Sequence, residues 1–394
     1  MMLTVTIILI IGSLQTACAN PCSDFSCDCQ GTEVICKSRD LEDVPDGIPN
    51  TTTLLNLGFH QISSLTANVF NGLVSLKTMD LSSNQISIIS ADTFKDLVSL
   101  VTLDLSYNQI SIILADTFKD LVSLVTLNFR GNQISTIAKD AFNDLVSLKN
   151  LDLSRNGIKT IAADAFINLT SLEQLKLEFN KISSLTANVF NGLVSINTIL
   201  LGGNQISTIA KDAFKDLVSL KNLFLENNKI STIATDTFKD LVSLTYITLY
   251  GNAFTAISAD IFRKLTNITR LNLSYIVTCC NMTDFFKWKA SQTELNELVG
   301  KCIDFDSVTD ITEFDISNCT IPVDGHWGSW STTSCSVTCG SGTKYRNRIC
   351  NNPSPSDGGK HCVGKDTELS QCRLRHCPAS CKHSKAQTRN QIKG

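Results

Sequence analysis

Apolar residues recur along most of this chain with one fixed spacing. The pattern L-x-x-L-x-L-x-x-N-x-I-x-x-I-x-x-x-x-F-x-x-L-x-x fills 24 residues and repeats nine times, without insertion or deletion, from Thr52 to Asn267. A unit of this size cannot bury its apolar face alone, whereas stacked units share one continuous core. The pattern therefore predicts a solenoid over residues 52–275, with nine full units and a partial tenth.

The L-x-L centre of each unit predicts a short strand whose leucines point inward and whose intervening residues point outward. Successive strands are expected to pair in parallel about 4.8 Å apart and to form a concave sheet roughly 45 Å along its arc. The asparagine that follows, as in Asn84 and Asn108, lies where the chain turns inward, and its amide can bond the backbone of adjacent turns. We expect departures only at the ends, at His60 and Ile276.

This repeat resembles the leucine-rich repeat, and the cysteines on either side strengthen the resemblance. The spacing C-x4-C-x-C-x6-C, followed by L-x-x-V-P-x-x-I-P, is similar to the N-terminal cap of extracellular leucine-rich repeat proteins and covers residues 20–51. The cysteines of residues 276–322 resemble the C-terminal cap, although Cys279 and Cys280 are adjacent where that cap usually has C-x-C. The repeats are also similar to those of variable lymphocyte receptors, which bind antigens on the concave face.

The resemblance implies an α/β-type solenoid, a horseshoe with a parallel concave β-sheet and a disulfide cap at each end. It implies the bonds Cys22–Cys29, Cys27–Cys36, Cys279–Cys302 and Cys280–Cys319. Four cysteines allow three pairings, so the connectivity of the rear cap stays open at this point. Within that cap, residues 284–290 are predicted to form a short helix with Thr283 as its N-cap.

A second module begins where the periodicity ends. The stretch from Trp327 to Cys350 contains W-x-x-W, C-x-x-T-C-G and three alternating cations, Lys344, Arg346 and Arg348, which on a strand would share one face and could stack against Trp327 and Trp330. It resembles a thrombospondin type 1 repeat, a small disulfide-rich, three-stranded module, over residues 323–378. That resemblance implies Cys335–Cys372, Cys339–Cys377 and Cys350–Cys362, with C-mannosylation at Trp327 and O-fucosylation at Thr338. Thr333 stands where family members often carry a third tryptophan.

The N-terminus and the cysteine content predict an extracellular destination. Residues 1–19 read as a secretory signal peptide that ends in Ala17-Cys18-Ala19, and no later apolar run is long enough to span a membrane. Cys381 is left over once the other cysteines are assigned, which suggests a disulfide-linked dimer. Sequons for N-glycosylation occur at Asn50, Asn168, Asn267, Asn272, Asn281 and Asn318.

The units differ from one another mainly at the outward positions of the strands. Residues 62–75 and 182–195 are identical, whereas the residue between the two leucines changes from unit to unit. A fixed scaffold with a varied outward face predicts a ligand-binding surface, although varied surface residues can also be simply unconstrained. The predicted concave site has a charged half, Asp80, Asp104, Arg130, Asp152, Arg155 and Lys176, and an aromatic half, Leu200, Phe224, Tyr246 and Tyr250.

Charge separates the two modules. The chain before Asp324 holds 23 Lys and Arg against 33 Asp and Glu, and the chain from Asp324 onward holds 11 against 4, with a basic tail at residues 379–394. An extracellular basic module suggests heparan-sulfate-type glycosaminoglycans rather than nucleic acid.

The five histidines lack metal-ligand spacing, and no nucleophile or phosphate-binding motif occurs, so the sequence predicts neither an enzyme nor a metal or cofactor site. We expect a secreted recognition or adhesion glycoprotein that binds a protein or glycoconjugate and is tethered to matrix or cell surface by its second module. The alternative is a structural matrix glycoprotein that binds sulfated glycosaminoglycans.

Overall fold

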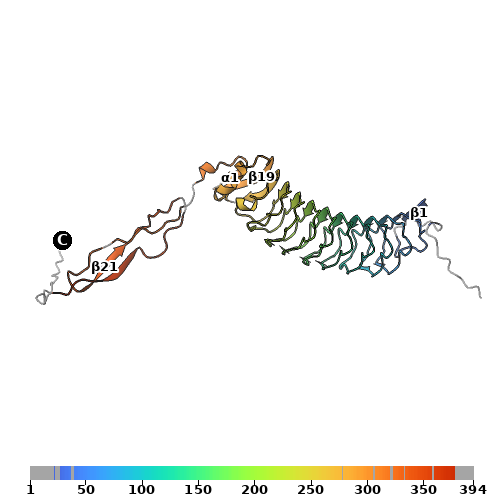
Figure 1. The fold of residues 1–394 in the computed structure, drawn as a ribbon, viewed down its shortest axis with the longest axis horizontal. Helices are drawn as coiled ribbons and strands as arrows, with labels where there is room; N and C mark the ends of the chain where they lie inside the picture. Colours follow the sequence, from blue (N-terminus) through green and yellow to red (C-terminus); the bar gives the residue numbers. More distant parts are fainter. Residues whose placement is uncertain are drawn as a thin grey trace, which may run out of the picture. The chain divides into compact units, whose positions relative to one another are not determined.

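The computed structural model describes residues 22, 27–36, 40–276, 278–304, 307–319, 323–331, 333–356 and 359–377. The proposed signal peptide, Cys18, Cys381 and the basic tail lie outside the described residues. The chain divides into two compact units, Met1–Ile316 and Ser317–Gly394. Each unit is described by itself (Figure 1).

The first unit is a solenoid built on one long sheet. Figure 1 shows its turns stacked side by side, each contributing a short strand to the same face. In spatial order the strands are β1 (Cys27–Gln30), β2 (Glu33–Cys36), β3 (Leu54–Asn56), β5 (Thr78–Asp80), β7 (Thr102–Asp104), β8 (Thr126–Asn128), β10 (Asn150–Asp152), β12 (Gln174–Lys176), β14 (Thr198–Leu200), β16 (Asn222–Phe224), β17 (Tyr246–Thr248), β18 (Arg270–Ile276), β19 (Glu297–Asp304) and β20 (Ser307–Asp310). All pairs from β2 to β19 are parallel, and the antiparallel pairs β1–β2 and β19–β20 close the two ends. This confirms the predicted parallel sheet.

The opposite side of the coil consists mainly of turns. It carries three short parallel pairs, β4 (Ser64–Leu65) with β6 (Ile88–Ile89), β9 (Thr136–Ile137) with β11 (Thr160–Ile161), and β13 (Ser184–Leu185) with β15 (Thr208–Ile209). The 3-10 helices are η1 (Ala259–Ile261), η2 (Cys279–Met282) and η3 (Ile316–Asn318). Among the described residues, the one α-helix is α1 (Thr283–Ala290) in the rear cap. Thr283 is its first residue rather than its N-cap, a place taken by Met282, so that detail of the prediction is wrong.

The core is a set of parallel apolar columns. The repeat phenylalanines are almost fully buried, and their rings stack in two runs, Phe70 to Phe118 and Phe142 to Phe214, with centroids 6.2 Å apart for Phe70 and Phe94 and 6.1 Å apart for Phe142 and Phe166. At the rear cap, Phe262 contacts Phe285 of α1 at a centroid distance of 6.1 Å. The repeat leucines and isoleucines fill the space between this column and the sheet.

Buried asparagines join the turns on the polar side. Asn156 donates from Nδ2 to the carbonyls of Phe129 (2.9 Å) and Leu153 (3.1 Å), and its Oδ1 accepts from the amide of Ile134 at 3.0 Å. The same triplet of bonds recurs at Asn84, Asn108, Asn132, Asn180, Asn204, Asn228 and Asn252. In the first unit His60 takes the position, and its Nε2 lies 3.1 Å from the carbonyl oxygen of Cys36.

Both caps are closed by disulfides. The bonds Cys22–Cys29, Cys27–Cys36 and Cys279–Cys302 are present, and Cys280 and Cys319 are also disulfide-bonded. In the second unit, β21 (Ser341–Asn347) pairs antiparallel with β22 (Thr367–Arg373), and Cys335–Cys372, Cys339–Cys377 and Cys350–Cys362 cross-link the module. The tryptophan segment runs beside β21 and the residues that follow it, through the bridge Trp327–Cys350 and the bonds from Gly328 N to Ile349 O (2.8 Å) and from Ser331 N to Asn347 O (2.7 Å).

Asn156→Ala should lower the stability of the solenoid markedly. The substitution removes the hydrogen-bond partner of the Ile134 amide and of the Phe129 carbonyl. A buried polar group without a partner costs about 1–3 kcal/mol of stability. Urea unfolding followed by circular dichroism should show a clearly lower midpoint. Asn71→Ala, at an exposed asparagine of the outer turns, is the control. Equal midpoints for the two variants would contradict a structural role for the asparagine ladder.

Candidate binding face

Besides the position that begins each strand, as at Tyr246 and Arg270, the outer face of the long sheet presents three side-chain positions from each turn. The first lies between the two leucines, as at Phe224, and the second follows the second leucine, as at Tyr250. The third directly precedes the ladder asparagine, as at Arg155. We call these rows the strand row, the middle row and the rim row. The leucines that alternate with them are buried, which leaves this face mainly to polar and aromatic side chains.

The predicted concave residues all reach this face. Asp80, Asp104, Arg130, Asp152, Lys176, Leu200, Phe224 and Tyr246 are half-buried, Arg155 is exposed, and 48% of the Tyr250 surface is exposed. The central condition of the prediction, that Phe224 and Tyr250 stay out of the core, is met. Their role in binding remains a prediction.

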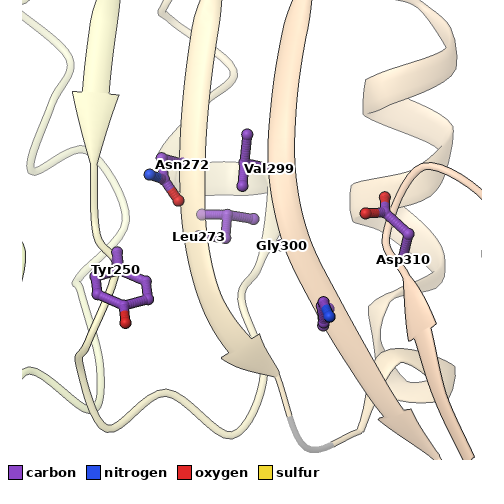
Figure 2. A pocket seen from close by; sticks show the side chains of 7 residues that line it. Tyr250, Asn272, Leu273, Val299, Gly300 and Asp310 are labelled. Carbon is purple, nitrogen blue, oxygen red and sulfur yellow. The ribbon is translucent and has the colours of Figure 1, made fainter.

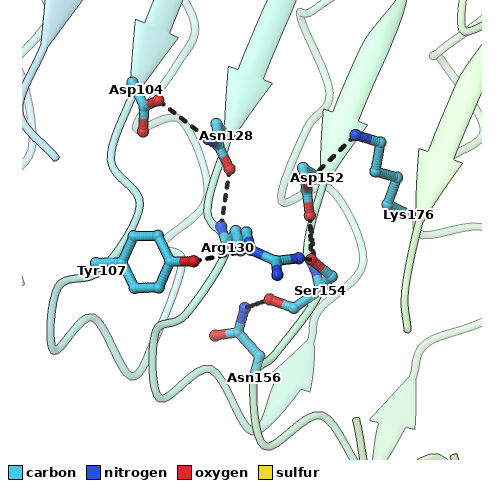
Figure 3. Close-up of polar contacts among 8 residues, drawn as sticks. All are labelled: Asp104, Tyr107, Asn128, Arg130, Asp152, Ser154, Asn156 and Lys176. Atoms are coloured by element: carbon cyan, nitrogen blue, oxygen red, sulfur yellow. Dashed lines mark hydrogen bonds and ion pairs between the residues drawn. The ribbon is translucent and has the colours of Figure 1, made fainter. Parts of the chain in front are cut away.

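A polar network holds the charged half of the face (Figure 3). Asn128 donates to Asp104 Oδ2 at 3.0 Å, and Arg130 donates to the Tyr107 hydroxyl at 3.1 Å and to the Ser154 hydroxyl at 2.8 Å. The Ser154 hydroxyl in turn donates to Asp152 (2.6 Å), which also faces Lys176 Nζ at 3.5 Å. Each charge therefore has a partner from a neighbouring turn, so the network fixes the side chains.

Three exposed aromatic side chains on the rim row were missed by the sequence prediction. Phe59, Tyr107 and Phe179 adopt positive φ angles of 63°, 53° and 56°, in the left-handed region where bulky side chains are unusual. Tyr107 is 51% and Phe179 54% exposed. The rim row has positive φ in all nine units, and other units fill it with Gly131, Asn227 or Gly251, which adopt this conformation more easily. The sequence signal that could have identified them is an aromatic residue directly before the ladder asparagine, at a position where the turn favours glycine.

The rim aromatics are held in place from both sides. The Arg155 guanidinium lies 4.6 Å from the centroid of the Phe179 ring. On the next turn, a Cβ added to Gly203 would come within 2.8 Å of the same ring, so glycine there leaves room for it. Tyr107 lies over Gly131 in the same way. Arg155, predicted as part of the charged half, thus belongs to this aromatic rim.

The aromatic half of the face lies further along the sheet. Phe224 and Tyr246 meet edge to face with ring centroids 5.3 Å apart, and Arg270 covers Tyr246 at 4.4 Å. Leu200 is the register neighbour of Phe224 on the adjoining strand. Thr248, the next residue of the strand row, is short and only 4% exposed.

Two glutamates of the middle row also escaped the sequence prediction. The Oε2 atoms of Glu178 and Glu226 are buried without a hydrogen-bond partner. Burial raises the pKa of both carboxyls, and for Glu178 the neighbouring Asp152 carboxylate adds to the rise in pKa. Among the acceptors on this face, these oxygens and Asn272 Oδ1 are buried and unsatisfied.

The second unit contains part of the predicted cation–π stack. Arg346 lies 4.7 Å from the centroid of Trp330, and Arg348 lies 4.4 Å from Trp327 and 4.5 Å from Trp330. The cation–π contacts found in the described part of this module use these two arginines and not Lys344. Thr333, at the position of the missing third tryptophan, donates to the Tyr345 carbonyl instead.

The predicted modification sites differ in accessibility. Asn50, Asn168, Asn267, Asn281 and Thr338 are exposed. Trp327 is half-buried and donates from Nε1 to the Val363 carbonyl at 2.9 Å, and Asn272 is half-buried within β18. The side chain of Asn318 lies outside the described residues. Modification at all of these positions remains a prediction.

Within the described ranges, no cluster of three or more histidine, cysteine or acidic side chains could hold a metal ion. No helix in the same ranges has the length and apolar character needed to cross a membrane.

Comparison with known proteins agrees with both modules. The leucine-rich repeat family model matches overlapping segments that together span residues 50–254, and the thrombospondin type 1 domain model matches residues 325–377. Mouse hemicentin-1 is 50% identical over 58 residues, and Xenopus laevis thrombospondin-1 is 47% identical over 58 residues. Each alignment covers 14% of this chain but only 1% and 5% of the respective relative.

Solved structures resemble the solenoid. A TLR13 chain in complex with ssRNA13 superposes with a TM-score of 0.58 and 28% identity, covering 66% of this chain and 37% of that one. A chain from an octameric complex of latrophilin 3, Unc5D and FLRT2 superposes with a TM-score of 0.55 and 25% identity, covering 70% of this chain and 91% of that one. That complex combines FLRT2 leucine-rich repeats with Unc5D immunoglobulin and thrombospondin type 1 domains.

Glu226→Gln should stabilise the protein near neutral pH but not in acid. Because burial raises the pKa of this carboxyl, the folded state binds the proton more tightly than the unfolded state does. Wild-type stability therefore falls as pH rises from the unfolded value, about 4.3, through the folded one. Thermal unfolding should show a higher melting temperature for the variant at neutral pH, with the gain disappearing near the unfolded pKa.

The control for this prediction is Glu173→Gln, which removes a glutamate paired with Lys149 at 2.8 Å on the surface. It should give no gain at neutral pH. A Glu226→Gln variant whose advantage is the same at every pH would disprove the burial argument.

Proposed function

Because the chain belongs to the leucine-rich repeat family and carries a thrombospondin type 1 domain, we propose that it is a secreted glycoprotein that binds a protein or glycoconjugate ligand on its concave face. The two domain types together indicate an extracellular recognition or adhesion protein, and both families typically serve as non-enzymatic recognition modules. The thrombospondin module is proposed to tether the chain to matrix or cell surface.

The rim row carries this proposal. Phe59, Tyr107, Arg155 and Phe179 occupy a left-handed position that other units give to glycine, asparagine or serine. A non-glycine residue in this region costs about 1–3 kcal/mol, and such residues often mark ligand contacts. The exposed rings contribute little to the core, which leaves ligand contact as the reason we favour for their presence.

The geometry of the face supports a protein-sized ligand. The sheet is long and open, and its arginines and aromatic rings are fixed by neighbouring turns rather than free in solvent. Side chains held in place before binding lose little conformational freedom on association. Such a surface favours a broad contact with a partner over a deep small-molecule site.

Replacing Phe179 and Phe224 together with serine should weaken binding to a cognate cell-surface or matrix partner at least tenfold, which corresponds to about 1.4 kcal/mol. The measurement is surface plasmon resonance with a partner identified by proximity labelling around the purified full chain. Both residues lie outside the core, so the melting temperature should change little.

The control replaces Val194 and Val218 with serine, because these exposed valines lie on the turns away from the sheet. This control variant should bind as the wild type does. A concave double variant that keeps full affinity would overturn the proposal.

One observation favours the matrix alternative. The chain from Asp324 onward holds 11 basic against 4 acidic residues, although Arg346 is already paired with Glu368 at 2.6 Å and stacked on Trp330. Elution of the full chain from heparin well above physiological salt, with diffuse binding to many sulfated polymers, would favour a structural matrix role. Elution near physiological salt would leave recognition as the better account. The proposed dimer through Cys381 would appear as a doubled mass that collapses on reduction.

A further inference from the structure

The concave sheet ends in a hollow of about 310 Å³, beside the rear cap. Figure 2 shows Tyr250 and Asn272 on one side and Val299 and Asp310 on the other; Asn272 belongs to β18 and Val299 to the neighbouring strand β19. All of these residues belong to the first unit. A volume near 300 Å³ is at the lower end of the range for ligand pockets.

The hollow arises from a change of side-chain length along the strand row. Phe224, Thr248, Asn272 and Val299 follow one another in register across β16 to β19. Thr248 and Asn272 are short, whereas Tyr250 next to them in the middle row is large and 48% exposed. Val299, on the far side, is 44% exposed although it is apolar. The pocket therefore has two apolar walls that the core does not use.

The polar groups of the pocket determine what it can accept. Asn272 Oδ1 is buried and has no hydrogen-bond partner, so a ligand that supplies a donor would satisfy it. Lys301 and Asp310 are register partners on β19 and β20 and carry opposite charges. The Asp310 carboxylate already accepts bonds from the Thr312 hydroxyl (2.6 Å) and amide (2.9 Å). The pocket thus holds an unsatisfied acceptor and carries no excess charge, which disfavours a cationic or anionic ligand group.

We propose that this pocket receives a tyrosine or tryptophan side chain of a protein ligand, with its ring between Tyr250 and Val299 and its O–H or N–H donating to Asn272 Oδ1. Tyrosine and tryptophan combine an apolar body with a neutral donor, which is the combination that the lining calls for. The inference rests on the proposed concave binding face and names one anchor within it. It also requires that the sequon at Asn272 stay unmodified, because a sugar there would fill the same space.

The test uses the full chain and small probes, so it does not depend on knowing the partner. Saturation-transfer NMR titrations compare N-acetyl-tyrosinamide, N-acetyl-phenylalaninamide and methyl N-acetylglucosaminide. We expect the tyrosine probe to bind, the phenylalanine probe to bind at least fivefold more weakly because it lacks the donor, and the sugar to give no signal. Equal binding of the two aromatic probes, preferential sugar binding, or absence of tyrosine binding would overturn the proposal.

Matched variants locate the binding. Val299→Trp should fill the hollow and abolish the tyrosine signal, whereas Val308→Trp, at a valine that is 58% exposed on β20 and does not line the pocket, should leave it unchanged. Tyrosine binding that survives Val299→Trp places the probe elsewhere and overturns the proposal. Peptide mapping of the secreted chain should show unmodified Asn272, and a glycan at that residue would likewise overturn it.

The outcome is separable from that of the proposed function. Phe179 and Phe224 do not line the pocket. If the Phe179 and Phe224 double variant loses the partner but the Val299→Trp variant binds it normally, the concave face stands as the binding site and the anchor pocket is disproved. If the Val299→Trp variant loses the partner and the wild type binds the tyrosine probe, both proposals are supported.

Discussion

The structure depends on satisfying the backbone where each turn folds inward. A strand of three residues forms hydrogen bonds with its neighbours only along its own length. The loop after it would leave backbone amides and carbonyls inside the coil without hydrogen-bond partners. The buried asparagine amides supply both a donor and an acceptor at this point, and each links its own turn to the preceding one. Because the same bonds recur in turn after turn, the phenylalanines behind them stay aligned and stack in two runs, Phe70 to Phe118 and Phe142 to Phe214.

Because the units repeat, the positions that stabilise the fold differ from the positions that form the outer surface. The apolar columns and the ladder use fixed positions in every unit, so the outward positions are free to vary without loss of the core. The rim row shows how that freedom is used. Its left-handed backbone is imposed by the turn, yet Tyr107 and Phe179 occupy it instead of glycine, and Gly131 and Gly203 of the following turns leave room for their rings. The display surface is thus built across turns, from residues 24 positions apart in the chain.

Electrostatics divides the same face into two regions. In the charged half, the Ser154 hydroxyl links Arg130 to Asp152, and Asp152 also pairs directly with Lys176. In the half near the rear cap, Glu226 and Asn272 hold buried acceptor oxygens without donors, beside Phe224 and Tyr250. A ligand could satisfy these oxygens with its own donors, and the same holds for the buried Oε2 of Glu178 in the charged half.

The 24-residue spacing and the alternation within L-x-L were enough to predict the parallel sheet, the buried columns and the outward direction of Phe224 and Tyr250, because these follow from local periodicity. The cysteine and tryptophan spacings pointed in the same way to the caps and the thrombospondin module. The left-handed turn at Tyr107 and Phe179, the burial of Glu226 and the hollow beside Asn272 could not be read from the chain. They depend on the path of the turn and on the relative lengths of side chains brought together from different turns, and the tertiary structure alone determines both.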